Sequence, residues 1–580
     1  MSSALKHNEE YFDYSPLSIV VGVAIGVLMT ASFSYAALVL GFSTNGSPVA
    51  AVLGWGIMRF FFKRGTIVEN NIIQTVASGI NTSTAGVIFT VPVLLIRGAE
   101  FNFFWVLAAC VAGAILGVGF IIPLRKQMID VDRLRFPSGT AIASILKSPA
   151  EGMKKSKLLV AGAALSAAVY LLTQFPTLGL PEIIPSSFDL NVLLGLPDYF
   201  NNIWAVSLLS VGIGFIAGRN GLFVLAGGVL AYWLITPVMI NQNWLPSEMN
   251  PTEAVHFIHA NMTRPIGIGM LIGGSLMSIV LIIPAIKATI KSFNVKALGS
   301  GSSDELPITL LYKVIGAAFV LFFMAGYFTS DISFFTAMIV SIVSTVWLLF
   351  AGIIVSQATG MTDWTPISGM SLIAVALLMM FLTSDQIVTA VLIGAGVSVA
   401  ISESADMMQD LKTGYLVGSI PKKQQKLQLI VAGLGPLISI SVMLLIWNSG
   451  GTDPVTGAQL PGFGPGTNIE APQAVALGAT IDSVVEGNVP GDKFLAGGII
   501  GALLSFTSIP GLGVIMGIAM YLSMKYILPY GLGSLIGFIT IKRKGKRWSE
   551  KWGVPFAAGM ILGEALLIIV FALLKVGGIV

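Results

Sequence analysis

Residues 103–123 read FFWVLAACVAGAILGVGFIIP, an apolar run without a single charged side chain. A helix needs about 20 such residues to cross the hydrocarbon core of a bilayer. Similar runs recur along the whole chain, for example at 17–40, 266–284 and 334–354. The first of these is long and has no small-residue cleavage site after it, which indicates a retained helix rather than a signal peptide. The sequence therefore predicts a chain that crosses a membrane many times.

The composition supports the same prediction. Of the 580 residues, 55% are hydrophobic and only 10% are charged, whereas a soluble domain carries roughly 25% charged residues. The surface must therefore face mostly lipid. A single cysteine, Cys110, excludes a disulfide framework or a Cys-based zinc site. His256 and His259 have a spacing that could bind a metal, but they lie in a polar stretch where we expect solvated side chains. We therefore expect neither a metal nor a cofactor.

Charged residues divide the predicted loops into two classes. Lys and Arg cluster at 59–64, 125–157, 287–296, 412–426 and 542–551. Acidic residues without any Lys or Arg occupy 181–202, 241–262 and 447–470. Short loops rich in Lys and Arg stay in the cytoplasm, so we expect a multi-pass protein of the inner (plasma) membrane with a cytoplasmic N-terminus. The basic clusters flank predicted spans and contain no interleaved aromatic residues, and we therefore expect no nucleic-acid partner.

We expect an all-α polytopic integral membrane protein with roughly 14–16 transmembrane helices in one domain, 1–580. Two stretches differ from ordinary spans, because 136–146 (FPSGTAIASIL) and 471–486 (APQAVALGATIDSVVE) are short and carry a proline at their start. Short, Pro-interrupted segments in corresponding parts of two halves indicate the binding site of a transporter. We interpret them as re-entrant segments whose N-termini favour an anionic group of the substrate, with interfacial loop helices as the alternative. The substrate-binding candidates here are Pro137, Ser138, Thr140, Pro472 and Gln473.

An internal duplication is a related hypothesis. Residues 71–79 (NIIQTVASG) and 406–414 (DMMQDLKTG) agree in their Gln and Gly at an offset of 335, and Pro137 and Pro472 share that offset. Two halves, 1–300 and 301–580, would follow. The charge pattern, however, places Pro137 near the inside and Pro472 near the outside, so the two inferences conflict.

A polar stripe lies within one of the apolar helices. In residues 69–84 (ENNIIQTVASGINTST), Gln74, Ser78 and Asn81 follow one another at i, i+4 and i+7, with Asn70 and Asn71 one turn earlier. Hydrogen bonding between helices could explain a few such groups. Five on one face favour the lining of a substrate pathway, so we include all five among the substrate-binding candidates.

Acidic residues also lie within or beside the apolar runs. Charged groups at the centre of a membrane helix cost about 2.5–3.5 kcal/mol on insertion scales and usually mark ion or substrate pathways. One acidic face, interleaved with the candidate Gln409, is formed by Glu403, Asp406 and Asp410 at i, i+3 and i+7. Asp482 and Glu486 share a second face at i, i+4. Glu564 stands alone in a predicted span, as either a proton site or a packed structural residue.

Several of these segments resemble the oligopeptide transporter family, which includes the yellow-stripe-like transporters of plants and many bacterial members. The resemblance rests on stretches in the family's order: NNIIQTVASGINTSTAGVIFTVP (70–92), LRFPSGTAIASIL (134–146), QDLKTGYLVGSIPKKQQ (409–425), APQAVALGATIDSVVEG (471–487) and GMILGEAL (559–566). It implies a proton-driven importer of short peptides or peptide-like metal chelates. The implied partners are this small-molecule substrate, protons and the lipid bilayer.

A carrier without an ATP site must use an ion gradient, and here the resemblance implies protons. The proton-coupling candidates are Asp482 and Glu486, which we rank first because paired carboxylates favour a bound proton, and then Glu564, Asp406, Asp410 and Glu403. The G-x-x-x-x-G-K-[ST] phosphate loop of an ATP-driven pump is absent. Signatures of an intramembrane enzyme are absent as well, so we expect no enzymatic activity. A channel, or an ion-coupled carrier of another small solute, is the alternative function.

Overall fold

The computed structural model describes most of the chain. The described residues are 15–41, 46–147, 149–242, 251–292, 304–329, 332–362, 365, 367–450, 460–467, 469–485, 491–509, 511–520, 522–577 and 579.

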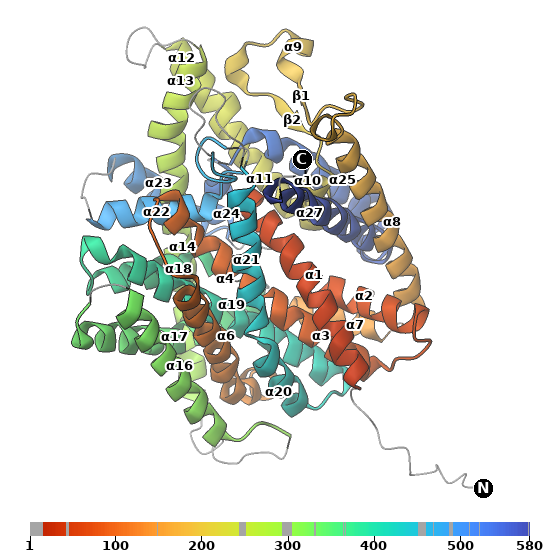
Figure 1. Cartoon of the computed structure of the whole chain (residues 1–580), viewed down its shortest axis with the longest axis vertical. Coiled ribbons are helices and arrows are strands. Elements are labelled where there is room, and N and C mark those ends of the chain that lie inside the picture. Colours follow the sequence, from red (N-terminus) through yellow and green to blue (C-terminus); the bar gives the residue numbers. More distant parts are fainter. Residues whose placement is uncertain are drawn as a thin grey trace.

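Helices form nearly all of the described chain (Figure 1). The first half contains α1 (Pro16–Leu40), α2 (Ser47–Phe60), α3 (Ile67–Asn81), α4 (Ser83–Thr90), α5 (Pro92–Ile96), α6 (Phe103–Arg125), η1 (Lys126–Val131), α7 (Pro137–Leu146), α8 (Pro149–Thr173), η2 (Pro176–Leu178), α9 (Leu190–Leu194), η3 (Asp198–Phe200), α10 (Leu208–Ala217), η4 (Gly218–Asn220), α11 (Gly221–Gly228), η5 (Val229–Ile235), α12 (Thr236–Asn241), α13 (Pro251–Ile258), η6 (His259–Thr263) and α14 (Arg264–Ser292).

The second half is helical in the same way. It contains α16 (Ile308–Thr329), α17 (Phe334–Thr362), α18 (Ile367–Met379), η7 (Ser384–Gln386), α19 (Ile387–Val417), α20 (Pro421–Val431), α21 (Leu434–Asn448), α22 (Pro472–Val485), α23 (Gly491–Leu504), α24 (Leu512–Ala519), α25 (Met524–Lys544), α26 (Lys546–Trp548), η8 (Ser549–Gly553) and α27 (Val554–Val576). Two short strands, β1 (Ser187–Asp189) and β2 (Ile203–Ala205), pair antiparallel with Phe188 opposite Trp204.

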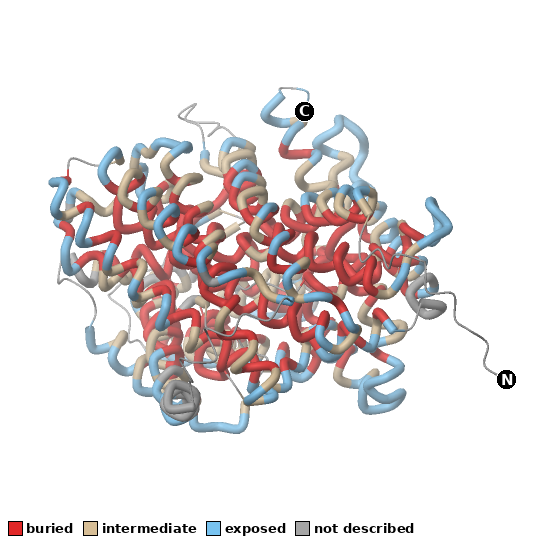
Figure 2. Tube along the Cα trace, turned by 90° about the horizontal axis from the view of Figure 1, so that it is seen from below, coloured by how far each residue is buried: buried red, intermediate tan, exposed pale blue. Residues whose placement is uncertain are grey.

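Within the described residues, eleven helices are long and apolar enough to cross a membrane. Three consecutive helices, α3 to α5, form one such span of 30 residues. The all-α polytopic architecture predicted from the sequence is therefore confirmed. Large apolar side chains on the outer helices are exposed, for example Phe335 and Phe350 on α17, as lipid-facing helices require. The buried residues gather in the middle of the molecule (Figure 2).

One basic segment and several acidic segments lie at opposite ends of the molecule. The basic helix α20, with Lys422, Lys423 and Lys426, lies at one end. The strands β1 and β2 and the helices α9, α12 and α13, which belong to the acidic segments, lie at the other end (Figure 1). This separation agrees with loops that lie on two different sides of a membrane.

The two Pro-initiated segments form short helices. At 1.5 Å per residue, the 10 residues of α7 and the 14 described residues of α22 span about 15 and 21 Å, less than the roughly 30 Å of a hydrocarbon core. The residue before each proline is in the left-handed region, with φ of 43° at Phe136 and 47° at Ala471. Non-glycine residues rarely adopt this conformation, so the two segments share an unusual start as well as the sequence offset of 335.

His259 departs from the solvated loop expected from its sequence context. It begins the π-helix η6, where its Nδ1 lies 3.3 Å from the hydroxyl of Tyr232 and its ring stacks on the Tyr232 ring at 5.7 Å. The polar composition around it did not reveal this aromatic partner on a distant helix. The side chain of His256 lies outside the described residues.

Candidate substrate cavity

A cavity of about 580 Å³ lies between the two halves of the chain, within the range of about 300–1,000 Å³ typical of small-molecule sites. Its walls come from α1, α2, α3, α4, α10, α11, α18, α19, α24, α25 and α27, and from the first turns of α7 and α22. Phe33, Phe89 and Ile213 provide apolar surface. The polar lining includes Asn81, Ser138, Ser402, Asp406, Gln409 and Gln473. The cavity therefore combines an apolar body with a few polar groups, as ligand sites do.

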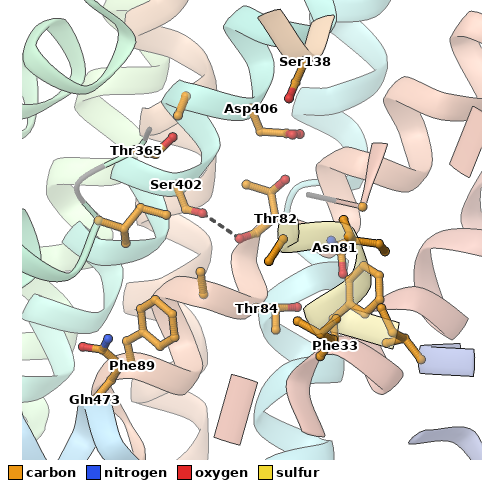
Figure 3. Close-up of a pocket in the computed structure, with 18 of the residues that line it drawn as sticks. Phe33, Asn81, Thr82, Thr84, Phe89, Ser138, Thr365, Ser402, Asp406 and Gln473 are labelled. Atoms are coloured by element: carbon orange, nitrogen blue, oxygen red, sulfur yellow. Dashed lines mark hydrogen bonds between the residues drawn. The ribbon is translucent and has the colours of Figure 1, made fainter. Parts of the chain in front are cut away.

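Five residues predicted from the sequence line this one cavity: Asn81, Ser138, Asp406, Gln409 and Gln473. They come from α3, α7, α19 and α22, which are far apart in the chain. In Figure 3, Ser138 and Gln473 lie at opposite ends of the view, and Asp406, Ser402 and Asn81 lie between them. Among the described lining residues, Asp406 is the one carboxylate, and none is Lys or Arg.

The first turns of α7 and α22 meet the cavity from different sides. Ser138 and Gln473 are the second residues of their helices, directly after the initiating prolines. A helix N-terminus carries a partial positive charge and unpaired N–H groups. Nearby, the amide oxygen of Asn81, which is 6% exposed, has no hydrogen-bond partner within the described structure. The donor groups of both helix N-termini therefore face the same space, and the unsatisfied amide oxygen of Asn81 lies buried beside it.

The rest of the polar stripe on α3 packs against the acidic face of α19. Ser78 Oγ donates to Asp406 Oδ2, and Gln74 Nε2 donates to Asp410 Oδ1 at 2.5 Å. Asn71 Nδ2 in turn donates to Gln74 Oε1 at 3.1 Å. All five side chains are buried or nearly so. Two motifs that the sequence presents separately therefore form one hydrogen-bonded layer, of which Asp406 reaches the cavity.

Glu403 extends this layer by one further turn of α19. Its Oε1 accepts a hydrogen bond from Ser83 Oγ at 2.8 Å, and its Oε2 lies 3.4 Å from Gln428 Nε2 of α20. Glu403 is completely buried and does not line the cavity. Its partners are neutral hydroxyl and amide groups, as are the side-chain partners of Asp406 and Asp410 in the described part of the chain.

The model of the OPT oligopeptide transporter protein family matches residues 14–575 of this chain. The chain belongs to the OPT family. A Haemophilus influenzae protein named "Putative oligopeptide transporter" is 27% identical, over 93% of this chain and 92% of its own length. Two plant proteins named "Probable metal-nicotianamine transporter" are also similar. YSL6 of Arabidopsis thaliana is 24% identical over 81% of this chain and 74% of its own, and YSL13 of Oryza sativa subsp. japonica is 23% identical over 97% and 84%.

Membership of the OPT family makes this chain a multi-pass membrane transporter rather than an enzyme. The family membership and the membrane-transporter class expected from the sequence are thereby confirmed. The family match covers every helix that lines the cavity, from α1 to α27.

Several predicted residues of this OPT transporter lie away from the cavity. Asn70 Nδ2 donates to the carbonyl of Ala51 at 3.0 Å, which joins α3 to α2. Thr140 Oγ1 donates to the carbonyl of Arg135 at 2.8 Å in the first turn of α7. Pro137 and Pro472 begin their helices without lining the cavity themselves. These residues have structural contacts that account for them without a substrate.

Asp482, one of the two acids ranked first from the sequence, also lies away from the cavity. Asp482 Oδ1 accepts a hydrogen bond from Arg97 Nη1 at 2.5 Å, and the two side chains are 42% and 26% exposed. Exposed ion pairs of this kind contribute about 0–1 kcal/mol. Glu486 lies outside the described residues. Of the two described acids, the geometry therefore favours Asp406 over Asp482 as the coupling candidate.

Glu564 has the contacts of a helix cap. Its carboxylate accepts hydrogen bonds from Ser207 Oγ at 2.7 Å and from the backbone N–H of Leu209 at 2.8 Å, at the N-terminus of α10. A carboxylate at this position satisfies backbone donors and interacts favourably with the helix dipole. Of the two interpretations left open by the sequence, the contacts favour the structural residue.

Some residues of the cavity and its supporting layer carry no signal in the sequence. Ser47 and Asn220 belong to no stripe, and Thr82 and Ser402 lie beside the polar stripe and the acidic face without sharing the spacing that defines them. Ser402 Oγ, for example, donates to the backbone carbonyl of Thr82 at 2.9 Å (Figure 3). A proline after Ser47 indicates a helix start, but nothing in the pattern relates this residue to α19.

The depth of the stripe can be measured with cysteine substitutions. In a Cys110→Ala background, we expect Asn81→Cys to react with a membrane-impermeant thiol reagent at least about tenfold faster than Ser78→Cys. Asn81 lines the cavity, whereas Ser78 is 1% exposed and lies behind Asp406. Cys110 itself is completely buried. Equal reaction rates at the two positions would contradict the described arrangement.

Glu470, three residues before Gln473, gives a test of pH dependence. Burial raises the pKa of Glu470 to about 7, and the charge of Arg264 opposes that rise. An unfolded glutamate titrates near 4.3, so the folded state holds the proton more tightly and loses stability as the pH rises from about 4 to above 7. We expect Glu470→Gln to raise the thermal unfolding midpoint in detergent by about 2 °C at pH 8 and to leave it unchanged at pH 4.5. The same rise at both pH values would contradict this assignment.

Proposed function

We propose that this OPT transporter is a proton-coupled importer of oligopeptides or peptide-like metal chelates in the plasma membrane, with a cytoplasmic N-terminus. The observation that carries the proposal is the cavity where Asp406 and the first turns of α7 and α22 meet. The relatives named for oligopeptide and for metal-nicotianamine transport support the two substrate classes.

The lining groups suit a substrate with both carboxylate and cationic groups. Without Lys or Arg among the described lining residues, substrate carboxylates would bind the N-termini of α7 and α22, as anions bind helix N-termini elsewhere. The amides of Asn81, Gln409 and Gln473 would add hydrogen bonds. A substrate ammonium group, or the metal of a chelate, would face Asp406. Peptides and amino-carboxylate chelates both have this distribution of charge.

Proton coupling is assigned to the acidic face of α19. Glu403, Asp406 and Asp410 occupy successive turns, and their described side-chain partners are neutral. Neighbouring carboxylates in a dry site do not all ionise together, so this layer would bind a proton. Because Asp406 also lines the cavity, it could bind either a proton or a cationic group of the substrate. The binding of one would therefore oppose or assist the binding of the other.

We also propose that the halves 1–300 and 301–580 are an inverted duplication. In this pairing, α1, α8 and α14 of the first half correspond to α17, α23 and α27 of the second half. The helix α8 packs against α27, and its counterpart α23 packs against α14. Likewise, α1 contacts α27, and its counterpart α17 contacts α14. The matching left-handed residues before Pro137 and Pro472 support the same pairing. An inverted repeat places corresponding segments on opposite sides of the membrane. The conflict between the charge pattern and the repeat then disappears.

The experiment is uptake into proteoliposomes of purified protein. Labelled trialanine and nickel–nicotianamine are compared with and without an inward proton gradient, and counterflow is measured at equal pH. A carrier accelerates exchange when the probe is loaded on the far side, whereas a channel does not. We expect counterflow of at least one probe and stimulation by the proton gradient. Flux of a probe without counterflow would favour the channel, and transport of neither probe would contradict the proposed substrate classes.

A further inference from the structure

A second carboxyl group lies behind Asp406, away from the cavity. Asp410, one turn further along α19, is completely buried and does not line the cavity. Its Oδ1 accepts a hydrogen bond from Gln74 Nε2 at 2.5 Å. Its Oδ2 has no partner within the described residues. A buried, charged carboxylate with an unpartnered oxygen is costly, and a proton bound to either oxygen of Asp410 would make the group neutral.

One hydroxyl group connects the two carboxyl groups. Ser47, the first residue of α2, is completely buried, and its Oγ lies 3.4 Å from Asp406 Oδ1 and 3.4 Å from Asp410 Oδ1. It also lies 2.5 Å from Ser78 Oγ, which donates to Asp406 Oδ2. A serine hydroxyl has one donor and two acceptor positions. It can therefore accept a proton from one carboxyl group and give its own to the other.

We propose that Asp410 stores the coupling proton and that Ser47 passes it between Asp410 and Asp406. This inference rests on the proposed proton coupling. In the transfer, the O–H bond of protonated Asp406 breaks as a new O–H bond forms on Ser47, and the original Ser47 O–H bond breaks as one forms on Asp410. Two protons move in concert, the net result is the transfer of one proton from Asp406 to Asp410, Ser47 is unchanged, and no electrons are exchanged.

The surroundings hold Asp410 in position for this role. Gln74 is oriented by Asn71, whose Oδ1 accepts a hydrogen bond from Ser419 Oγ at 2.6 Å. Gln424 Nε2 of α20 donates to the backbone carbonyl of Asp410 at 3.0 Å. The ionisable groups that face Asp410 are Asp406 and Glu403 of its own helix, and α2, α3 and α20 contribute neutral side chains to it. A stored proton thus leaves Asp406 free to become charged when a cationic substrate group binds.

The test uses the proteoliposomes and probes described above. We expect Ser47→Ala to lower uptake driven by the proton gradient by at least about tenfold and to leave counterflow at equal pH within about twofold of wild type. Ser47→Thr keeps a hydroxyl and should restore gradient-driven uptake. The control is Ser398→Ala, because Ser398 is equally buried on α19 but donates only to the carbonyl of Gly394 at 2.7 Å. This variant should behave as wild type.

The outcomes separate this inference from the proposed function. If wild-type uptake ignores the proton gradient, proton coupling fails and the relay fails with it. If wild type responds to the gradient and Ser47→Ala equals it, the relay alone is wrong. Loss of counterflow together with gradient-driven uptake in Ser47→Ala shows a structural role and also overturns the relay.

A measurement without any probe tests the storage site directly. Infrared difference spectra of purified protein between acidic and alkaline pH record protonated carboxyl groups. We expect Asp410→Asn to remove one titrating carboxyl band, and Asp482→Asn, at an exposed ion pair, to leave that band in place. An unchanged spectrum in Asp410→Asn would overturn the storage site even if the Ser47 variants fail to fold.

Discussion

Asp406→Asn is expected to lower gradient-driven uptake by about 100-fold or more. The substitution removes the one carboxylate among the described lining residues of the cavity. The cavity then lacks both a group that binds a proton and a partner for a cationic group of the substrate. Asparagine has nearly the same shape and can still accept the hydrogen bond from Ser78, so the layer between α3 and α19 should persist. The measurement is initial uptake of trialanine and nickel–nicotianamine under an inward proton gradient.

Asp482→Asn is the matched control for this prediction. It makes the same chemical change at a half-exposed carboxylate paired with Arg97, and we expect uptake within about twofold of wild type. If Asp482→Asn abolished uptake and Asp406→Asn did not, the original ranking from the sequence would be right and the cavity would lose its central role.

Gly113→Ala is expected to cause the largest loss of folded protein. Gly113 of α6 packs against the backbone of Gly396 on α19, and a Cβ atom there would overlap the Gly396 carbonyl oxygen. Small residues allow membrane helices to approach this closely, and a backbone carbonyl cannot move aside as a flexible side chain can. Overpacking costs typically about 1–3 kcal/mol, and α19 carries the acidic face, so the cavity would be displaced as well.

Gly316→Ala controls for the effect of a methyl group on a membrane helix. Gly316 lies in α16, and nothing among the described residues lies within 4 Å of its Cβ position. We expect its yield of monodisperse protein and its thermal unfolding midpoint to equal or slightly exceed those of wild type, because alanine favours helix more than glycine. Equal behaviour of the two variants would show that α6 and α19 do not pack as described.

The sequence predicted the all-α membrane architecture, because apolar length determines which segments can cross a bilayer. It indicated roughly 14–16 spans, whereas eleven helices among the described residues are long and apolar enough to cross. It also identified the polar stripe on α3 and the acidic face on α19, since both depart from the apolar pattern at helical spacing. It could not show that these faces contact each other. Gln74 and Asp410 are 336 positions apart, and spacing within one helix says nothing about its partner.

The ranking of the acidic residues depended on partners that spacing does not reveal. Asp482 is half-exposed beside Arg97, a residue 385 positions away, and Glu564 caps a helix whose first residues carry no acidic motif. Ser47 was not predicted, because a single hydroxyl residue has no spacing pattern that could identify it. Conversely, the two Pro-initiated segments were found because proline at a short apolar stretch restricts the backbone locally, and both Ser138 and Gln473 line the cavity.

The position of bound substrate tests the central claim most directly. A cryo-electron microscopy structure of the protein with nickel–nicotianamine, or with trialanine if that is the transported probe, would locate it. The account predicts density in the cavity, with substrate carboxylates at the first turns of α7 and α22 and the cationic group or metal toward Asp406. Density at any other site, with this cavity unchanged between the free and bound structures, would contradict it.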